Sequence, residues 1–78
     1  MAALNYLPLA FPKHPPAIAI GGANGVRLRY ELRGARGKGW ELEIQANGLR
    51  RTRAFPTRAQ AEQAAKDDFR RRQFLRVA

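Results

Sequence analysis

The feature that most constrains the fold is a strict alternation of apolar and polar residues over 26–33 (VRLRYELR) and again over 40–46 (WELEIQA). Successive side chains of a β-strand point to opposite faces, so this two-residue period predicts two strands, each with an apolar and a polar side. The predicted inward side holds Val26, Leu28, Tyr30, Leu32, Trp40, Leu42, Ile44 and Ala46. The predicted outward side holds Arg27, Arg29, Glu31, Arg33, Glu41, Glu43 and Gln45. We therefore expect a sheet with one buried face and one charged face.

Glycine-containing stretches predict the turns of this sheet. Residues 34–39 (GARGKG) separate the two alternating stretches and predict a mobile hairpin loop. Asn47-Gly48 is a strong signal for a tight two-residue turn. Residues 49–55 (LRRTRAF) follow this turn directly, and they predict a third antiparallel strand.

The third predicted strand contains a conflict. Strict alternation places Arg51 and Arg53 on the face of Phe55, where a core would not accept them. A bulge, or a strand edge that reaches past the covering helix, would remove the conflict. The sequence leaves open which of Arg50, Arg51 and Arg53 point outward, and requires only that at least one or two do.

A helix is predicted to begin after Pro56. Thr57 is a good N-cap residue, and Gln60 three positions later completes a capping box. A narrow apolar stripe then recurs at helical spacing in Ala61, Ala64, Ala65 and Phe69. The predicted fold class is α+β: a three-stranded antiparallel sheet packed on one C-terminal helix, with an irregular N-terminal arm.

Residues 1–24 are predicted to form a proline-rich apolar arm, attached to a sheet-and-helix domain of residues 25–78. AIAI (17–20) fits either a short edge strand or the end of the arm, and the glycines of GGANG (21–25) favour a turn or loop. Four prolines interrupt the apolar run, which argues against a signal peptide or a membrane span. The arm either covers part of the core or docks on a partner, and its apolar residues are Leu4, Tyr6, Leu7, Leu9 and Phe11.

The charge of the chain favours a polyanionic partner. Its 78 residues include fifteen Lys and Arg against six Asp and Glu, a formal charge of +9. Residues 25–55 alone hold eight basic and three acidic residues, so five of these positive charges have no local counterpart. Nucleic acid and anionic membrane surfaces both attract such a chain. The lack of cysteine excludes a disulfide framework and fits a cytoplasmic location.

Catalytic residues are hard to find in this sequence. His14 is the only histidine and lies in the proline-rich arm, and the chain has neither serine nor cysteine, so no familiar nucleophile–base pair can form. The glycine-rich stretches match no nucleotide-binding fingerprint. Glu41 and Glu43 share a strand face with arginines, and cross-strand ion pairing explains them more simply than acid–base chemistry. We expect no enzyme, no metal site and no cofactor.

Three motifs occur in a characteristic order: GVRLR (25–29), GKGWELEI (37–44) and RAFPTRAQAEQAA (53–65). Together they resemble the Apetala-type DNA-binding domain of plant ethylene-response factors, and the arm-site-binding domains of phage and transposon tyrosine integrases look similar. The resemblance covers about residues 25–70. It implies a three-stranded sheet that lies in the major groove, with base or phosphate contacts from Arg27, Arg29, Glu43, Arg50, Arg51 and Arg53.

The predicted nucleic-acid-binding residues are Arg27, Arg29, Arg33, Lys38, Glu43, Gln45, Arg50, Arg51 and Arg53. The planar fork of arginine can bind two phosphate oxygens, or guanine O6 and N7 together, and glutamine can read adenine in the same way. Glu43 could accept a hydrogen bond from cytosine or orient a neighbouring arginine. These features predict a small non-enzymatic protein that binds double-stranded DNA, with a mobile element or prophage as its expected origin.

Two alternatives stay open. The first is an RNA-binding module that follows an A-form backbone, although Tyr30 and Trp40 fall on the inward side and leave no stacking pair outward. The second is a protein-interaction module that uses the N-terminal arm and the tail FLRVA (74–78). The sequence indicates no oligomeric state.

Overall fold

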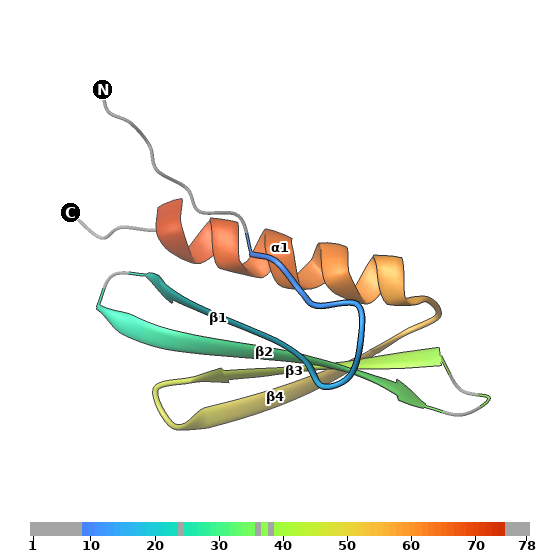
Figure 1. The fold of residues 1–78 in the computed structure, drawn as a ribbon. Helices are drawn as coiled ribbons and strands as arrows, with labels where there is room; N and C mark the ends of the chain where they lie inside the picture. Colours follow the sequence, from blue (N-terminus) through green and yellow to red (C-terminus); the bar gives the residue numbers. More distant parts are fainter. Residues whose placement is uncertain (1–8, 24, 36, 38, 75–78) are drawn as a thin grey trace.

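The computed structural model describes residues 9–23, 25–35, 37 and 39–74. Four antiparallel strands form one sheet in the order β1-β2-β3-β4, and one helix lies across a face of it (Figure 1). The elements are β1 (Ala17–Ala23), β2 (Val26–Ala35), β3 (Gly39–Ala46), β4 (Leu49–Phe55) and α1 (Arg58–Phe74). The predicted α+β class, antiparallel sheet and C-terminal helix are confirmed.

The prediction of three strands is wrong, because β1 adds a fourth strand at the edge of the sheet. β1 pairs with β2 over its whole length. It includes Gly21 and Gly22, although these two glycines favoured a loop in the sequence. A Cβ atom on Gly21 would lie 2.6 Å from two ring carbons of Phe69. Glycine at this position therefore allows the helix to approach the strand closely, and it does not mark a turn.

The connections β2–β3 and β3–β4 differ in how well they were predicted. Asn47 and Gly48 have φ angles of 55° and 79° and connect β3 to β4, which confirms the tight turn. Positive φ at both central residues matches the twist of the flanking strands. The connection between β2 and β3 is shorter than the predicted loop, because β2 continues to Ala35 and β3 already begins at Gly39.

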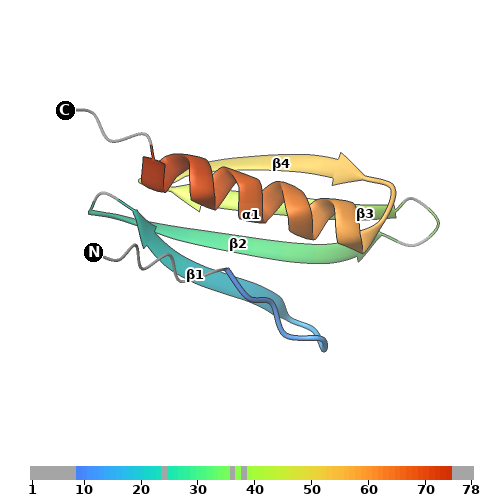
Figure 2. The same cartoon turned by 90° about the horizontal axis from the view of Figure 1, so that it is seen from above.

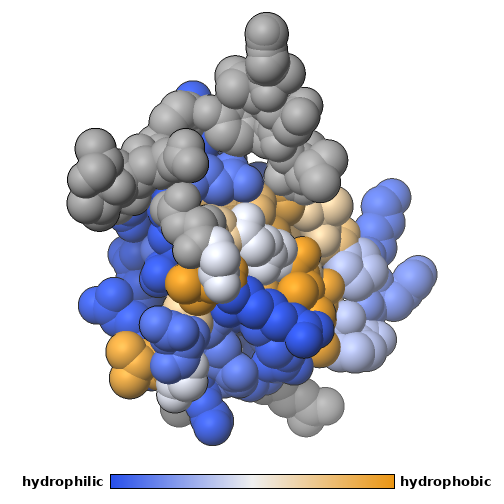
Figure 3. Space-filling model, turned by 90° about the vertical axis from the view of Figure 1, so that its left-hand side faces the viewer, coloured by the Kyte–Doolittle hydropathy of each residue, from blue (hydrophilic) through white to orange (hydrophobic). Residues whose placement is uncertain are grey.

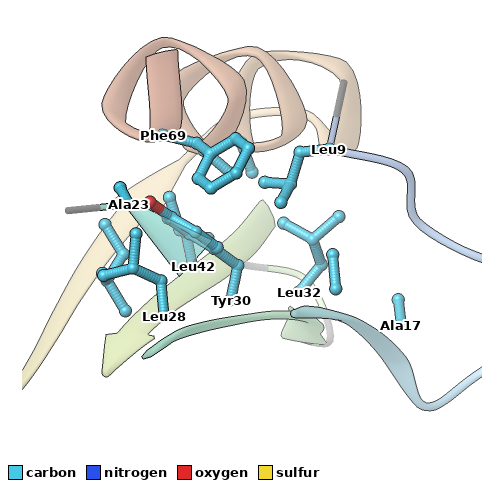
Figure 4. Packing of buried hydrophobic residues seen from close by; sticks show 12 residues of the cluster. Leu9, Ala17, Ala23, Leu28, Tyr30, Leu32, Leu42 and Phe69 are labelled. Carbon is cyan, nitrogen blue, oxygen red and sulfur yellow. The ribbon is translucent and has the colours of Figure 1, made fainter. Parts of the chain in front are cut away.

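The core lies between α1 and the sheet face that α1 covers (Figure 4). The side chains of Leu28, Tyr30 and Leu42 are fully buried there. The ring of Phe69 meets that of Tyr30 edge to face, with centroids 6.1 Å apart and planes at 82°, a favourable aromatic arrangement. The core comprises Leu9, Ala17, Ala19, Ala23, Leu28, Tyr30, Leu32, Leu42, Ile44, Ala61, Ala65 and Phe69.

The helix begins and packs as its sequence predicts. The backbone N–H of Gln60 donates to Thr57 Oγ1 at 3.2 Å, which confirms the N-cap. Ala61 and Ala65 are fully buried against the sheet, so the alanine stripe is the packing face of α1. Their small side chains let the helix lie close above the strands.

A polar cluster ties α1 to the middle of the sheet. The hydroxyl of Tyr30 donates to Asp68 Oδ2 at 2.7 Å, and Arg72 Nε donates to the same oxygen at 2.7 Å. Burial, followed by the Asp68 carboxylate, raises the pKa of Tyr30 well above its ordinary value. Burial also opposes ionisation of Asp68, but the hydrogen bonds from Arg72 and Tyr30 outweigh it and lower the pKa of Asp68. The ionised Asp68 therefore satisfies the one polar atom that Tyr30 brings into the core.

The described part of the arm runs beside α1 on the β1 side of the molecule (Figure 2). Leu9 belongs to the core. Arg58 holds the next segment in place, because its guanidinium donates to the backbone carbonyls of Pro12 and Lys13 at 2.6 and 3.1 Å. The same guanidinium lies 5.8 Å from the ring centre of Trp40. The predicted arm residues Leu4, Tyr6 and Leu7 and the tail residues 75–78 lie outside the described residues.

Candidate nucleic-acid interface

The candidate site is the sheet face opposite α1, which we term the open face. In Figure 1, α1 covers one side of the sheet and no described helix covers the other. Strand pairing without a break in register confirms the outward side predicted for β2 and β3. The polar residues of the open face are Arg27, Arg29, Glu31, Arg33, Glu41, Glu43, Gln45, Arg50 and Thr52. Among its described residues, the open face thus carries four arginines and three glutamates.

Glu43 is the centre of a hydrogen-bonded cluster on the open face. Its side chain is only 6% exposed. Oε1 accepts a hydrogen bond from Arg33 Nη1 at 2.8 Å, while Oε2 accepts one from Gln45 Nε2 at 3.0 Å and lies 3.4 Å from Arg50 Nε. The hydrogen bonds from Gln45 and Arg33 lower the pKa of Glu43. The carboxylate is therefore ionised at neutral pH and fixes the positions of its three neighbours.

This cluster favours one of the two roles predicted for Glu43. Both of its oxygens already have partners within the sheet, so the geometry fits orientation of the arginines better than contact with a base. Arg33 is engaged further, with Glu31 at 3.7 Å and Glu41 at 3.6 Å. Much of the positive charge of Arg33 and Arg50 is thus neutralised in place, although exposed pairs of this kind contribute little stability.

At the end of the open face near the β3–β4 turn, the arginines have fewer carboxylate partners than Arg33 has. Arg29 lies directly opposite Gln45 in the pairing of β2 with β3, and its one ion pair within the described chain is with Glu31 at 3.2 Å. Arg27 has no ion pair with any residue that the structure describes. These side chains border a shallow hollow of about 350 Å³, lined by Ile20, Arg27, Arg29, Gln45, Ala46, Asn47 and Gly48.

β4 divides its arginines between the two sides of the sheet. Arg50, opposite Gln45, lies on the open face, whereas Arg51 and Arg53 lie opposite the inward residues Ile44 and Leu42. The pairing is regular, so no bulge resolves the conflict in the sequence. β4 is an edge strand that runs along one side of α1 (Figure 2), and both arginines remain exposed on the helix side.

The surroundings of Arg51 and Arg53 differ from those of the open face. The guanidinium of Arg53 lies 5.0 Å from the ring centre of Phe55 on its own strand. Arg51 borders a separate hollow of about 420 Å³ together with Leu49, Val26 and Arg72. Figure 3 views the molecule from the end that carries the β1–β2 and β3–β4 turns, where apolar surface shows among hydrophilic side chains.

The structure therefore brings together only part of the predicted site. Arg27, Arg29 and Gln45 lie around one hollow, and Arg33 and Arg50 are held by Glu43. Lys38 lies outside the described residues. Ile20 and Asn47 also line the hollow and were not predicted. The Asn47-Gly48 turn signal and the alternation of AIAI were the available clues to their positions.

Comparison with known proteins adds no further information. No protein-family model, no curated protein and no solved structure matches the chain. Within the described residues, no helix is both long enough and apolar enough to cross a membrane. The same residues contain no group of three or more His, Cys, Asp or Glu side chains that could hold a metal ion.

Proposed function

We propose that this protein is a small non-enzymatic DNA-binding protein that places the open face of its sheet in the major groove. The observation that carries the proposal is the grouping of Arg27, Arg29 and Gln45 around one hollow of the open face, which no described helix covers. Strands in the major groove present alternate side chains to the base edges, and β2 and β3 are adjacent and antiparallel. The formal charge of +9 supplies attraction to the phosphates.

The three side chains have complementary roles in this proposal. Arg27 and Arg29 project from the same side of β2, two residues apart, so each can direct its planar fork to guanine or to a phosphate. The amide of Gln45 lies opposite Arg29 and can pair with adenine. Glu43 acts as a positioning residue, because it orients Gln45, Arg33 and Arg50 before DNA arrives.

The arrangement favours duplex DNA over single-stranded RNA. Single-stranded RNA is usually bound by aromatic side chains that stack on bases. The aromatic residues of the described strands, Tyr30, Trp40 and Phe55, all lie on the helix side of the sheet. The resemblance of the GVRLR, GKGWELEI and RAFPTRAQAEQAA motifs to groove-binding domains supports the same choice.

Binding to duplex DNA should weaken steeply as salt increases, because each neutralised phosphate releases condensed counterions. For about four phosphate contacts, the affinity should fall roughly 100-fold between about 50 and 200 mM monovalent salt. Fluorescence anisotropy with a labelled random duplex of about 20 base pairs measures this slope. A lack of binding at the lowest salt concentration would refute the proposed function. Tighter binding to a single-stranded RNA of equal length would move the assignment to RNA.

A further inference from the structure

The outer edge of β1 has no backbone partner among the residues that the structure describes. β1 is the first strand in the order β1-β2-β3-β4, and within the described sheet it pairs with β2 alone. Outside the helix and the strand ladders, the one backbone–backbone hydrogen bond among the described residues joins Ala61 to Thr57. The described arm therefore does not pair with β1. A seven-residue edge in this state presents a row of free N–H and C=O groups to another strand.

The two edges of the sheet differ sharply in chemistry. Proteins protect edge strands with charged side chains, bulges or proline. β4 follows this rule, because it carries Arg50, Arg51 and Arg53. Their charges repel the β4 strand of a second copy. β1 (AIAIGGA) contains no charged residue and no proline. Its open-face side chain Ile20 is 54% exposed, one of two large apolar side chains exposed to that extent among the described residues.

We propose that the outer edge of β1 pairs with β1 of a second copy of this chain. In an antiparallel arrangement with full overlap, Ile20 is the midpoint of β1 and meets Ile20 of the second copy. Ile18 then lies opposite Gly22, and on the helix side Ala19 lies opposite Gly21. No like charges meet across this pair, and the larger side chains face either an equal partner or a glycine, so the edge is complementary to itself.

Electrostatics favours this edge for a second copy. Each chain carries a formal charge of +9, so two copies repel each other least where the local charge is low. In the paired arrangement, the nearest open-face arginines lie on the two β2 strands, three strand spacings or about 14 Å apart. That distance exceeds the Debye length of about 8 Å at physiological ionic strength. The two-fold axis runs perpendicular to the sheet, so both open faces lie on the same side of the dimer.

The test measures the mass of nucleic-acid-free protein by sedimentation equilibrium. Pairing of one short strand buries less area than a standard interface, so we expect a monomer–dimer equilibrium with a dissociation constant in the range of about 10–1,000 µM. Because salt screens the repulsion between the copies, dimerisation should strengthen as salt increases. DNA binding should instead weaken as salt increases. The two interactions are therefore measured separately, and the failure of one proposal does not imply the failure of the other.

Two matched substitutions identify the edge. Ile20→Lys places like charges opposite each other at the two-fold axis and should weaken the dimer at least about 10-fold. Leu49→Lys makes the same change at the other exposed large apolar residue, on β4, and should leave the dimer unchanged. A mixture of Ile20→Lys and Ile20→Glu chains should recover dimer, because opposite charges then meet. Circular dichroism melts verify that each variant folds.

Three results would overturn the proposal. If the protein is monomeric at every concentration and salt level, β1 does not pair with a second copy. The β1 edge would then be available to an extended segment of a different protein. A dimer that Leu49→Lys disrupts and Ile20→Lys does not would place the contact on the β4 side. Failure of the Lys and Glu variants to form a mixed dimer would contradict pairing across Ile20.

Discussion

Gly39→Ala is expected to destabilise the domain by roughly 2–5 kcal/mol and to lower its melting temperature by about 10 °C or more. Gly39 has a φ of 85°, a conformation that costs an alanine about 1–2 kcal/mol. A Cβ atom there would also clash with the backbone carbonyl oxygen of Phe55 and lie 3.2 Å from that of Pro56. Relief of this clash would separate the start of β3 from the β4–α1 connection, which adds about 1–3 kcal/mol.

Gly48→Ala is the matched control for this substitution. Gly48 has a φ of 79°, but a Cβ atom there would meet no heavy atom within 4 Å. It should therefore show only the conformational cost, about 1–2 kcal/mol. Thermal melts of both variants isolate the steric part as the difference between them. Equal destabilisation by the two substitutions would contradict the close packing of β3 against the end of β4.

Replacing both Arg27 and Arg29 with alanine should weaken binding to duplex DNA by roughly 30-fold or more. Each good bidentate base contact contributes about 1–3 kcal/mol, and 2 kcal/mol corresponds to a factor of about 30. The fold should tolerate the change, because exposed strand positions usually alter stability by less than about 0.5 kcal/mol. Glu31, which loses Arg29 as its partner, still has Arg33 at 3.7 Å. Anisotropy titrations near physiological salt measure the loss.

The control removes the same charge with the same spacing from the other side of the sheet. Arg51 and Arg53 are two residues apart on β4 and lie on the helix side. Their double alanine variant should lose less than about 10-fold, since it changes only long-range attraction. Arg71 and Arg72 would be a poorer control, because both bind Asp68 within the fold. An equal loss in the two double variants would indicate unoriented electrostatic binding.

Local patterns predicted the central part of the fold. The two-residue period of β2 and β3 assigned each side chain to the correct face, and Asn47-Gly48 and Thr57 marked the turn and the helix start correctly. These signals depend on backbone preferences within a few residues. β1 was missed as a full strand, because the reason for Gly21 is the ring of Phe69, which lies far away in sequence.

The candidate site was less predictable than the fold. Alternation placed Arg51 and Arg53 on the face of Phe55, but their exposure on that face depends on how far α1 extends over β4, which no local pattern encodes. The Glu43 cluster depends on the register between strands, since Arg33 and Arg50 reach it from β2 and β4. The sequence predicted an excess of positive charge. Only the pairing of the strands shows that this charge is largely balanced around Glu43 and is less balanced near Arg27.

The most direct test of the proposed function is a nuclear magnetic resonance titration of ¹⁵N-labelled protein with unlabelled duplex DNA. The backbone amides and the arginine Nε–H groups report which face the DNA contacts. Binding through the open face predicts the largest shift changes at Arg27, Arg29 and Gln45, with small changes at Arg51 and Arg53. Changes concentrated on α1 or on the helix side of β4, with β2 unaffected, would contradict the assignment of the open face as the DNA-binding surface.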